Sequence, residues 1–475
     1  MMPDVSVIGG GLSGAEAAWQ IARRGLWVRL VEMRPEVSTP AHQSGEFAEL
    51  VCSNSLKSDL PGTAPFLLKE ELRRLGSLLM RIADEVRVPA GHALAVDRGL
   101  FARRVTEAVT GNPRIQVVRE EAKTLGSEGI CIVATGPLTA PALSAAIADF
   151  AGAGHLYFYD AISPIVDAAT IDRARLFPAS RYGKGSDDYL NAAMSQAEYS
   201  RFYEALAAAA SAPWRDFEEA VYFEGCLPIE ELARRGFDTL RFGPMKPVGL
   251  VDPRTNRRPY AAVQLRRENL MADSYNLVGF QNHLRFPEQQ RIFRLIPGLE
   301  NGEFLRFGQI HRNTYLRAPA LLDATLQTRK RRSLFFAGQI CGVEGYVESI
   351  ATGLLAGINA ARLALGRAPV VAPRPTACGS LVHYLSSSSL AHFQPANISF
   401  GLLPEVSGDI ARTGDRKERH RRQVDAALVE MDRWIANLGD QTSDLRLPTS
   451  DLRPPTMGAQ DDIDFRDRRS AETDD

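Results

Sequence analysis

The sequence predicts an α/β fold in which a parallel sheet is assembled from separate stretches of the chain, with a smaller α/β domain inserted between them. A buried apolar strand, Val5–Ile8, is followed by a glycine-rich turn and a helical pattern, and a similar strand returns at 334–337. Between about 165 and 325 the chain is rich in Pro, Gly, Arg and aromatic residues and lacks a regular strand–helix alternation. A length of 475 residues, 45% of them hydrophobic, suits two such domains.

The individual elements follow from hydrophobic periodicity. Short runs of apolar and β-branched residues predict strands, and apolar residues three or four positions apart predict helices. The predicted elements are a helix from about 14 to 24, strands at 27–31, 115–118 and Ile130–Val133, and a helix near 348–365. Residues 66–84 predict one amphipathic helix, whose apolar face comprises Leu67, Leu68, Leu72, Leu75, Leu78, Leu79 and Ile82.

Domain boundaries are placed where the composition changes. Beyond about residue 440 the chain is polar, with Pro and Asp and few apolar residues, which is typical of a disordered tail. We therefore predict a first domain made of 1–90, 125–165 and 330–439, an insertion made of 91–124 and 166–329, and a disordered tail at 440–475.

The turn after the first strand carries the pattern G-x-G-x-x-G as Gly9, Gly11 and Gly14. The pattern alone is weak, but here it follows a strand, opens a helix and precedes a second strand that ends in Glu32. Glycines let the backbone approach a pyrophosphate at a helix N-terminus, and an acidic residue at the end of the second strand binds a ribose hydroxyl. We therefore predict a Rossmann-type dinucleotide site, rather than a chance glycine turn, formed by Gly9, Gly10, Gly11, Leu12, Ser13, Gly14 and Glu32.

FAD and NAD share this pattern, and two later segments favour FAD. Residues 133–136 end in Ala-Thr-Gly and resemble the second FAD-contacting strand of flavoproteins that bind two dinucleotides, which adds Thr135 and Gly136 to the site. Residues 336–342 resemble the late turn beside the flavin in that superfamily, although Gln339 stands where many members have Asp; this turn adds Gly338 and Gly342. A second good G-x-G-x-x-G is absent, so a separate NAD(P)H domain is not expected. We predict a glutathione-reductase-like FAD-binding domain.

Composition and charge narrow the possible functions. The formal net charge is -1, so any nucleic acid would have to bind a local basic patch rather than the whole surface. Five cysteines are too few for a disulfide framework and favour a reducing compartment. The N-terminus lacks the pattern of a signal peptide, and no apolar stretch is long enough to span a bilayer. We expect a cytoplasmic protein without a membrane span.

Two cysteine-bearing segments carry a family resemblance. Cys52 lies in Ala-Glu-Leu-Val-Cys-Ser-Asn-Ser-Leu-Lys, and Cys226 lies in Val-Tyr-Phe-Glu-Gly-Cys-Leu-Pro-Ile-Glu. Together with Met-Lys-Pro-Val-Gly-Leu at 245–250 and Gly-Phe-Gln-Asn-His-Leu at 279–284, these segments closely resemble the folate- and FAD-dependent tRNA uracil-5 methyltransferases, the TrmFO family. The resemblance extends from about residue 5 to 404.

The resemblance implies a reaction. Members of this family methylate C5 of uridine 54 in the T loop of tRNA, with carbon from 5,10-methylenetetrahydrofolate. Reduced FAD carries that carbon and supplies reducing equivalents, and NADH or NADPH is the expected reductant. Other members act on uridine in ribosomal RNA, so the RNA target stays open. The partners implied are thus tRNA, folate and NAD(P)H, and no obligate protein partner is indicated.

The resemblance also assigns roles to individual residues. C5 of uracil is a poor nucleophile, and a thiolate that adds at C6 makes C5 enolate-like, so that it can attack an electrophilic methylene. Cys226 matches the family cysteine proposed for that attack, and Cys52 matches the second cysteine, beside the flavin; which of them attacks uracil stays open. The resemblance places His283 at the folate, although Asn282 and the residues after Leu284 depart from the expected neighbours. Cys131 and Cys378 are expected to be buried and inert.

A compact basic run at 329–332 is a candidate RNA contact, because an enzyme that extrudes a base from a folded loop needs basic surface. A solvated charged surface is an equally good interpretation of these four residues. For the basic run that begins at Lys417, which contains acidic neighbours, we favour a solvated helix face. The candidate RNA-binding residues are therefore Arg329, Lys330, Arg331 and Arg332.

Four other functions compete with this one. A dithiol reductase would carry closely spaced cysteines beside the flavin, and the five cysteines here form no such pair. The related flavoprotein that modifies wobble uridine with a partner GTPase would have a longer chain with a helical C-terminal region. A plain FAD-dependent NAD(P)H oxidoreductase and an FAD-binding scaffold without activity remain compatible with the sequence.

Overall fold

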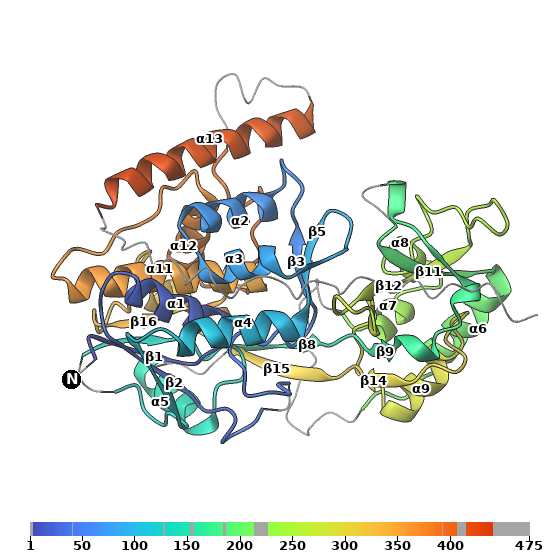
Figure 1. Cartoon of the computed structure of the whole chain (residues 1–475), viewed down its shortest axis with the longest axis horizontal. Helices are drawn as coiled ribbons and strands as arrows, with labels where there is room; N and C mark the ends of the chain where they lie inside the picture. The colour runs from blue at the N-terminus through green and yellow to red at the C-terminus, as the bar shows by residue number, and fades with distance from the viewer. Residues whose placement is uncertain are drawn as a thin grey trace, which may run out of the picture.

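The fold was determined as a computed structural model that describes residues 3–39, 41–126, 129–152, 156–183, 187–212, 227–391, 393–405 and 415–439. These residues form two lobes (Figure 1). The larger lobe contains both the N-terminal and the C-terminal described segments, and the smaller one, coloured green to yellow, is formed by the middle of the chain. The predicted tail, 440–475, lies outside the described residues.

A five-stranded parallel sheet is the centre of the larger lobe. The middle strand, β1 (Val5–Ile8), pairs with β2 (Val28–Glu32) on one side and β7 (Ile130–Val133) on the other. Beyond these strands, β6 (Ile115–Arg119) pairs with β2, and β16 (Leu334–Phe336) pairs with β7. All four pairings are parallel, so the carboxyl ends of the strands lie at one edge. The predicted α/β fold, with its late returning strand, is confirmed.

Two long helices pack closely against this sheet. Helix α1 (Leu12–Ala22) begins directly after the glycine-rich turn, and α11 (Tyr346–Ala364) follows the last strand. A Cβ atom on Gly353 of α11 would lie 2.2 Å from the carbonyl oxygen of Ser13, and one on Gly357 would lie 2.8 Å from that of Ala17. Glycine at these two positions therefore allows the two helix backbones to approach each other.

The single helix predicted over 66–84 is in fact two helices, α2 (Ala64–Arg74) and α3 (Leu78–Glu85). The chain turns at Gly76, where φ is 72°, and the Ser77 hydroxyl accepts the N–H of Met80 to cap α3. All seven predicted apolar side chains are nevertheless buried. A periodic pattern does not reveal a break that leaves the same face buried.

Residues 91–124 were predicted to belong to the insertion. The structure places them in the larger lobe instead. Strand β5 (Ala93–Val96) and helix α4 (Arg98–Thr110) place Leu94, Phe101 and Val105 in the core of the larger lobe. Strand β6 then joins the main sheet. A small antiparallel sheet in the same lobe combines β5 with β3 (Ser55–Ser58) and β4 (Arg87–Val88).

The insertion lobe has its own sheet and its own core, which contains Tyr199, Phe202, Phe280 and Phe293. Its six strands are all paired antiparallel, in the order β10-β11-β12-β13-β9-β14. The strands are β9 (Ile165–Asp167), β10 (Leu176–Pro178), β11 (Tyr189–Met194), β12 (Ala261–Arg267), β13 (Ser274–Leu277) and β14 (Phe304–Arg306). Its described helices are α6 (Gln196–Ala207), α7 (Ile229–Arg234), α8 (Thr239–Phe242) and α9 (Phe286–Phe293).

A two-stranded antiparallel ribbon links the lobes: β8 (Leu156–Ala161) leads out, and β15 (Ile310–Tyr315) returns. Helix α10 (Ala318–Leu321) and the residues up to Leu326 pack into the core of the larger lobe. The insertion therefore ends near β15 rather than at residue 329, because the apolar side chains after β15 are buried against the larger lobe.

The remaining helices complete the larger lobe: α5 (Pro141–Ala151), α12 (Ala377–Ser387) and α13 (Arg416–Asn437). Helix α13 packs on α2 and buries Val424, Ala427, Leu428 and Met431, while the basic residues Arg416, Lys417, Arg421 and Arg422 near its start are exposed. This arrangement agrees with the interpretation of the Lys417 run as a solvated helix face. Among the described helices, none has the length and apolar character needed to cross a membrane.

Candidate active site

The turn between β1 and α1 has no room for side chains at three of its four glycines. A Cβ atom on Gly14 would lie 1.7 Å from the carbonyl oxygen of Gly9, whose own φ is 101°. A Cβ atom on Gly10 would lie 2.4 Å from the ring of Phe47. At Gly11, by contrast, a Cβ atom would meet no described atom within 4 Å. The turn therefore packs tightly on its inner side and leaves open space at Gly11.

The open space belongs to a pocket at the carboxyl ends of β1, β2 and β7. Its volume is about 990 Å³ when the space in its open mouth is included. Gly10, Gly14 and Gly342 do not line this pocket. A Cβ atom on Gly342, where φ is 92°, would lie 2.5 Å from the ring of Phe393. This glycine therefore allows the late turn to pack against Phe393, outside the pocket lining. The predicted residues that do line it are Gly9, Gly11, Leu12, Ser13, Glu32, Thr135, Gly136 and Gly338.

The pocket fits FAD. It extends across neighbouring strands from Glu32, at the end of β2, to Gly338, after β16, so an acid for a ribose and a glycine turn for a pyrophosphate lie in one cavity. The Ser13 hydroxyl borders the pocket, is buried, and has no hydrogen-bond partner among the described residues. A buried polar atom in this position is suited to a bound ligand.

Glu32 is held in place by two partners. The N–H of Gly10 donates to its Oε2 at 2.7 Å, and Nε of Arg34 donates to its Oε1 at 2.8 Å. Burial alone would raise the pKa of Glu32, but the hydrogen bonds and the positive charge of Arg34 lower it below its ordinary value. The carboxylate is therefore ionised and oriented before any ligand binds, and Arg34 is a supporting residue that the motif did not identify.

Cys52 lies at the edge of this pocket. Its neighbour Val51 lines the pocket, and so does Tyr346, the first residue of α11. The phenolic oxygen of Tyr346 accepts the N–H of Cys52 at 2.8 Å and that of Ser53 at 3.1 Å. The structure thus brings the Cys52 segment to the late turn that was predicted to lie beside the flavin.

Two arginines lie near Cys52. Arg98 and Arg306 both interact electrostatically with Cys52, and both side chains are largely buried. Nη1 of Arg98 donates to the carbonyl oxygen of Leu50 at 2.7 Å, and Nη2 of Arg306 donates to that of Ala41 at 3.1 Å. Nearby guanidinium groups stabilise a thiolate. This setting suits a cysteine that acts as a nucleophile or a proton carrier.

The other described cysteines have a different environment. Burial raises the pKa of Cys131, in β7, and of Cys341 to about 12 in each case. Burial and the adjacent Glu71 carboxylate raise the pKa of Cys378 as well. These three thiols stay protonated near neutral pH, which agrees with the expected inert role of Cys131 and Cys378.

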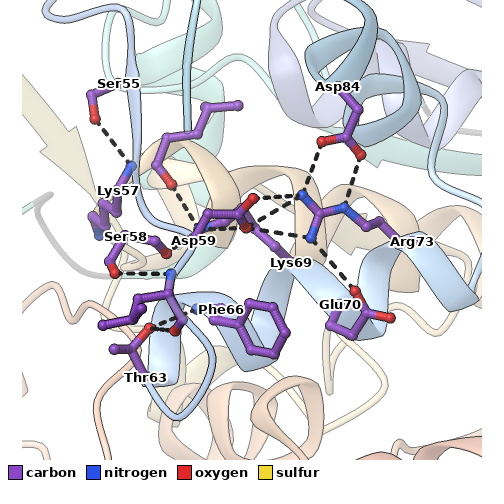
Figure 2. Close-up of polar contacts among 12 residues, drawn as sticks. Ser55, Lys57, Ser58, Asp59, Thr63, Phe66, Lys69, Glu70, Arg73 and Asp84 are labelled. Carbon is purple, nitrogen blue, oxygen red and sulfur yellow. Dashed lines mark hydrogen bonds and ion pairs between the residues drawn. The ribbon is translucent and has the colours of Figure 1, made fainter. Parts of the chain in front are cut away.

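A charged network supports the segment that follows Cys52 (Figure 2). Lys69, on α2, is fully buried, and its Nζ donates to the carbonyl oxygens of Leu56 at 3.0 Å and Ser58 at 2.6 Å. Its Nζ also lies 3.9 Å from Oδ1 of Asp59. The network continues through Glu70, Arg73, Asp84 and Arg87. Strand β3 is thereby fixed to helices α2 and α3.

Lys69 predicts a pH dependence of stability. Burial lowers its pKa from 10.5 to about 8, although Asp59 opposes the shift. The unfolded chain then binds more protons than the folded one from about pH 8 to 10.5, so the free energy of unfolding rises with pH there, by about 3 kcal/mol. We expect Lys69→Met to remove this rise, as measured by urea unfolding at about pH 7 and about pH 10. Lys417→Met, which alters an exposed lysine, should retain it; an unchanged rise in Lys69→Met would contradict the prediction.

His283 and Cys226 were the other two predicted reactive residues. His283 is buried in the insertion lobe, where its main-chain N–H donates to Oε1 of Glu230 at 2.6 Å. Burial raises the pKa of Glu230 to about 7. His283 is not among the residues that line the FAD pocket. Cys226 lies outside the described residues, so its role stays a prediction.

The basic run at 329–332 lies away from the pocket. It precedes β16, at the amino edge of the parallel sheet, whereas the pocket lies at the carboxyl edge. Arg329 and Arg332 pair with Asp323, and Lys330 and Arg331 donate to main-chain carbonyl oxygens of other segments. These contacts favour a role of the run in the fold of the larger lobe over a role in RNA binding. RNA binding here stays an untested prediction.

Comparison with known proteins identifies the family. Residues 4–368 match the model of the family described as Glucose inhibited division protein A. The methylenetetrahydrofolate--tRNA-(uracil-5-)-methyltransferase TrmFO of Koribacter versatilis is 60% identical over 434 residues, which cover 91% of this chain and 98% of that protein. The chain belongs to the TrmFO family, within this larger one. The TrmFO protein of Pelotomaculum thermopropionicum is 58% identical over 434 residues, covering 91% and 99%.

A solved structure agrees with the fold of this TrmFO chain. GidA of Aquifex aeolicus aligns with a TM-score of 0.67 at 18% identity, over 92% of this chain and 74% of that one. At this identity the likeness supports the fold alone.

Sequence reasoning missed the residues that orient Cys52 in this TrmFO chain. Tyr346 could have been noticed, because it follows Gly345 at the start of the helix after the late glycine turn. Arg98 and Arg306 could not, because they approach Cys52 from the start of helix α4 and from the end of strand β14 in the insertion lobe. Their proximity depends on how the two lobes meet.

Proposed function

We propose that this chain is an FAD-dependent RNA methyltransferase that forms 5-methyluridine at position 54 in the T loop of tRNA. The carbon comes from 5,10-methylenetetrahydrofolate, and NADH or NADPH reduces the flavin. The observation that carries the proposal is the 60% identity to a TrmFO protein over nearly its whole length. A dinucleotide pocket with a cysteine at its edge supports it.

The residues of the pocket have distinct tasks in this function. The N-terminus of α1 and the Gly11 backbone would hold the pyrophosphate, and the Glu32 carboxylate would hold a ribose. Bound FAD supplies a carrier for the methylene carbon and the electrons that convert it to a methyl group. The pocket walls near Thr135, Gly136 and Gly338 position that cofactor.

The two cysteines divide the remaining chemistry. One thiolate adds to C6 of uracil, which makes C5 nucleophilic, and the same thiolate leaves after the C5 proton has been removed. Cys226 is the candidate for that attack. Cys52, with Arg98 and Arg306 nearby, is the candidate for holding a proton or protecting the flavin. The sequence left open which cysteine attacks, and the experiment below separates them.

His283 is the candidate residue for folate. An imidazole can stack on a pterin ring, and the contact of the His283 backbone with Glu230 fixes the residue within the insertion lobe. Reaction between a folate there and a flavin in the larger lobe requires that the two lobes face each other. tRNA and folate are therefore the expected partners, no obligate protein partner is indicated, and the cytoplasm, where tRNA is modified, is the expected location.

Two alternatives differ in substrate. The same chemistry on a ribosomal RNA uridine would use the same pocket and cysteines, because only the RNA surface would change. A plain FAD-dependent NAD(P)H oxidoreductase would need neither cysteine. The two arginines near Cys52 favour the methyltransferase over the oxidoreductase.

The test uses the purified flavoprotein, tRNA with unmodified uridine 54, NADH or NADPH, and methylenetetrahydrofolate labelled in its methylene group. Wild type should place the label in 5-methyluridine. Cys226→Ala should reduce the rate by about 1,000-fold or more, and Cys52→Ala should also reduce it strongly. Cys378→Ala, in which a buried thiol away from the pocket is changed, is the matched control and should stay active.

The outcomes discriminate between the functions. If Cys226→Ala still forms a covalent adduct between protein and RNA and Cys52→Ala forms none, the roles of the two cysteines are reversed. A wild-type protein that oxidises NAD(P)H but labels neither tRNA nor ribosomal RNA would overturn the methyltransferase. Label in ribosomal RNA alone would replace the substrate and keep the chemistry.

A further inference from the structure

A buried arginine of the insertion lobe reaches the two residues that follow Cys52. Arg266, near the end of β12, is only 6% exposed. Its Nε donates to Oδ1 of Asn54 at 2.8 Å, and its Nη2 donates to the hydroxyl of Ser53 at 2.8 Å. In return, Nδ2 of the fully buried Asn54 donates to the carbonyl oxygen of Arg267 at 2.9 Å. The end of β12 and the turn at 53–54 are therefore joined in both directions.

The charge on Arg266 is costly in this position. Burial lowers the pKa of the Arg266 guanidinium, because the charged form has lost its water. The side-chain acceptors at Ser53 and Asn54 are neutral, and the nearby Glu268 and Tyr189 offset only part of that loss. An apolar side chain of similar size would avoid the cost. What the guanidinium provides instead is a pair of directional hydrogen bonds that fix the geometry of the turn.

The remaining anchors of the Cys52 segment come from the larger lobe. Tyr346 accepts the N–H groups of Cys52 and Ser53, and Arg98 donates to Leu50. Arg98 also pairs with Glu268, just after β12, at 2.9 Å. Cys52 therefore sits in a short stretch held on one side by the larger lobe and on the other by the end of β12.

We propose that Arg266 is a positioning residue for Cys52, which sets the orientation and the accessibility of the thiol from the insertion lobe. This inference rests on the proposed role of Cys52 at the flavin. The guanidinium holds Ser53 and Asn54 in place. Because Ser53 directly follows Cys52, the main chain transmits this restraint to the thiol. The reactivity of Cys52 consequently depends on the insertion lobe being docked on the larger lobe (Figure 1).

The test compares three variants of the FAD-loaded protein. Arg266→Met removes the hydrogen bonds to Ser53 and Asn54, and Arg266→Lys keeps the charge with a shorter reach. Arg267→Met is the matched control, since it removes the same charge from the next residue of β12, whose side chain points to the other face of the strand and whose carbonyl contact with Asn54 is retained. The first readout is the rate at which iodoacetamide alkylates Cys52, followed by peptide mass spectrometry without RNA or folate. The second is kcat and KM for tRNA methylation.

We expect Arg266→Met to be alkylated at Cys52 about tenfold faster than wild type, because the freed turn opens more often. Its kcat should fall by about tenfold or more, with KM for tRNA unchanged, since a misplaced reacting group slows chemistry rather than binding. Arg266→Lys should lie between wild type and Arg266→Met, and Arg267→Met should match wild type.

Two results would overturn the inference: a wild-type alkylation rate at Cys52 in Arg266→Met, or an equal acceleration in Arg267→Met. Should Arg266→Met also expose the buried Cys378, general unfolding is indicated and Arg266→Lys decides. In that case faster alkylation of Cys52 alone supports the inference, and a wild-type rate overturns it. The alkylation assay requires no RNA or folate, so a wild-type protein that fails to methylate tRNA would overturn the proposed function and leave this comparison intact.

Discussion

Gly11→Val is expected to yield a folded protein that no longer retains FAD. Gly11 has φ of -71° and ψ of -168°, which a β-branched residue adopts without strain, and its Cβ would meet no described atom. The added side chain would instead fill the pocket where the backbone must approach the pyrophosphate. The Kd for FAD should rise by about 100-fold or more, equivalent to about 3 kcal/mol. Visible absorbance of the purified protein and FAD titration of the apoprotein measure the effect.

Gly14→Ala is the informative contrast to Gly11→Val, because its Cβ would lie 1.7 Å from the carbonyl oxygen of Gly9. This variant should lose stability even without FAD, whereas Gly11→Val should unfold at the apoprotein's normal urea midpoint. Purification of Gly11→Val with a full complement of FAD would show that the cofactor does not approach the turn.

Gly353→Val should separate helices α1 and α11, which pack against each other beside the main sheet. A Cβ at this position would lie 2.2 Å from the carbonyl oxygen of Ser13 and 2.7 Å from its Cα, both main-chain atoms that cannot rotate away. Because α11 also carries Tyr346 and Ser349 to the pocket, the displacement should weaken FAD binding together with the fold. The free energy of unfolding should fall by about 3 to 5 kcal/mol, measured by urea unfolding with excess FAD.

A matched control exists on the same lobe. A Cβ on Gly401 would be 3.6 Å from the Ser399 hydroxyl, an ordinary contact, so Gly401→Ala should leave unfolding and FAD binding unchanged. Wild-type stability in Gly353→Val would mean that α1 and α11 adjust their spacing at little cost, which would remove the structural reason for glycine at this contact.

The parts of the fold that the sequence predicted are those fixed by neighbours in the chain. The strand–turn–helix from β1 to α1 and the acid at Glu32 depend on residues within one short unit, and the structure has them as expected. The break at Gly76 was missed, because both helices bury the same face. Residues 91–124 were assigned to the wrong lobe, because a strand pattern reveals β6 but not that its partner is β2.

The candidate site divides in the same way. The glycines and Glu32 follow from a local motif, whereas the position of Cys52 beside Tyr346 depends on a contact between residues 294 positions apart in the chain. The two arginines near Cys52 come from α4 and from β14, and no local pattern reveals that they meet there. Gly342, predicted as a cofactor contact, makes room for Phe393 and does not line the pocket.

The order of strands in the main sheet has a consequence for synthesis of the protein. Strand β7 pairs with β16, yet residues 134–333 lie between them in the chain. At about 5–20 residues per second, a ribosome takes roughly 10–40 s to translate that stretch. During this interval β7 is an unprotected sheet edge, and all core residues of the insertion lobe are made before β16 is. The nascent chain cannot retain the flavin until Gly338 and Tyr346 have emerged, so a product truncated after the insertion lobe would be a colourless, aggregation-prone fragment.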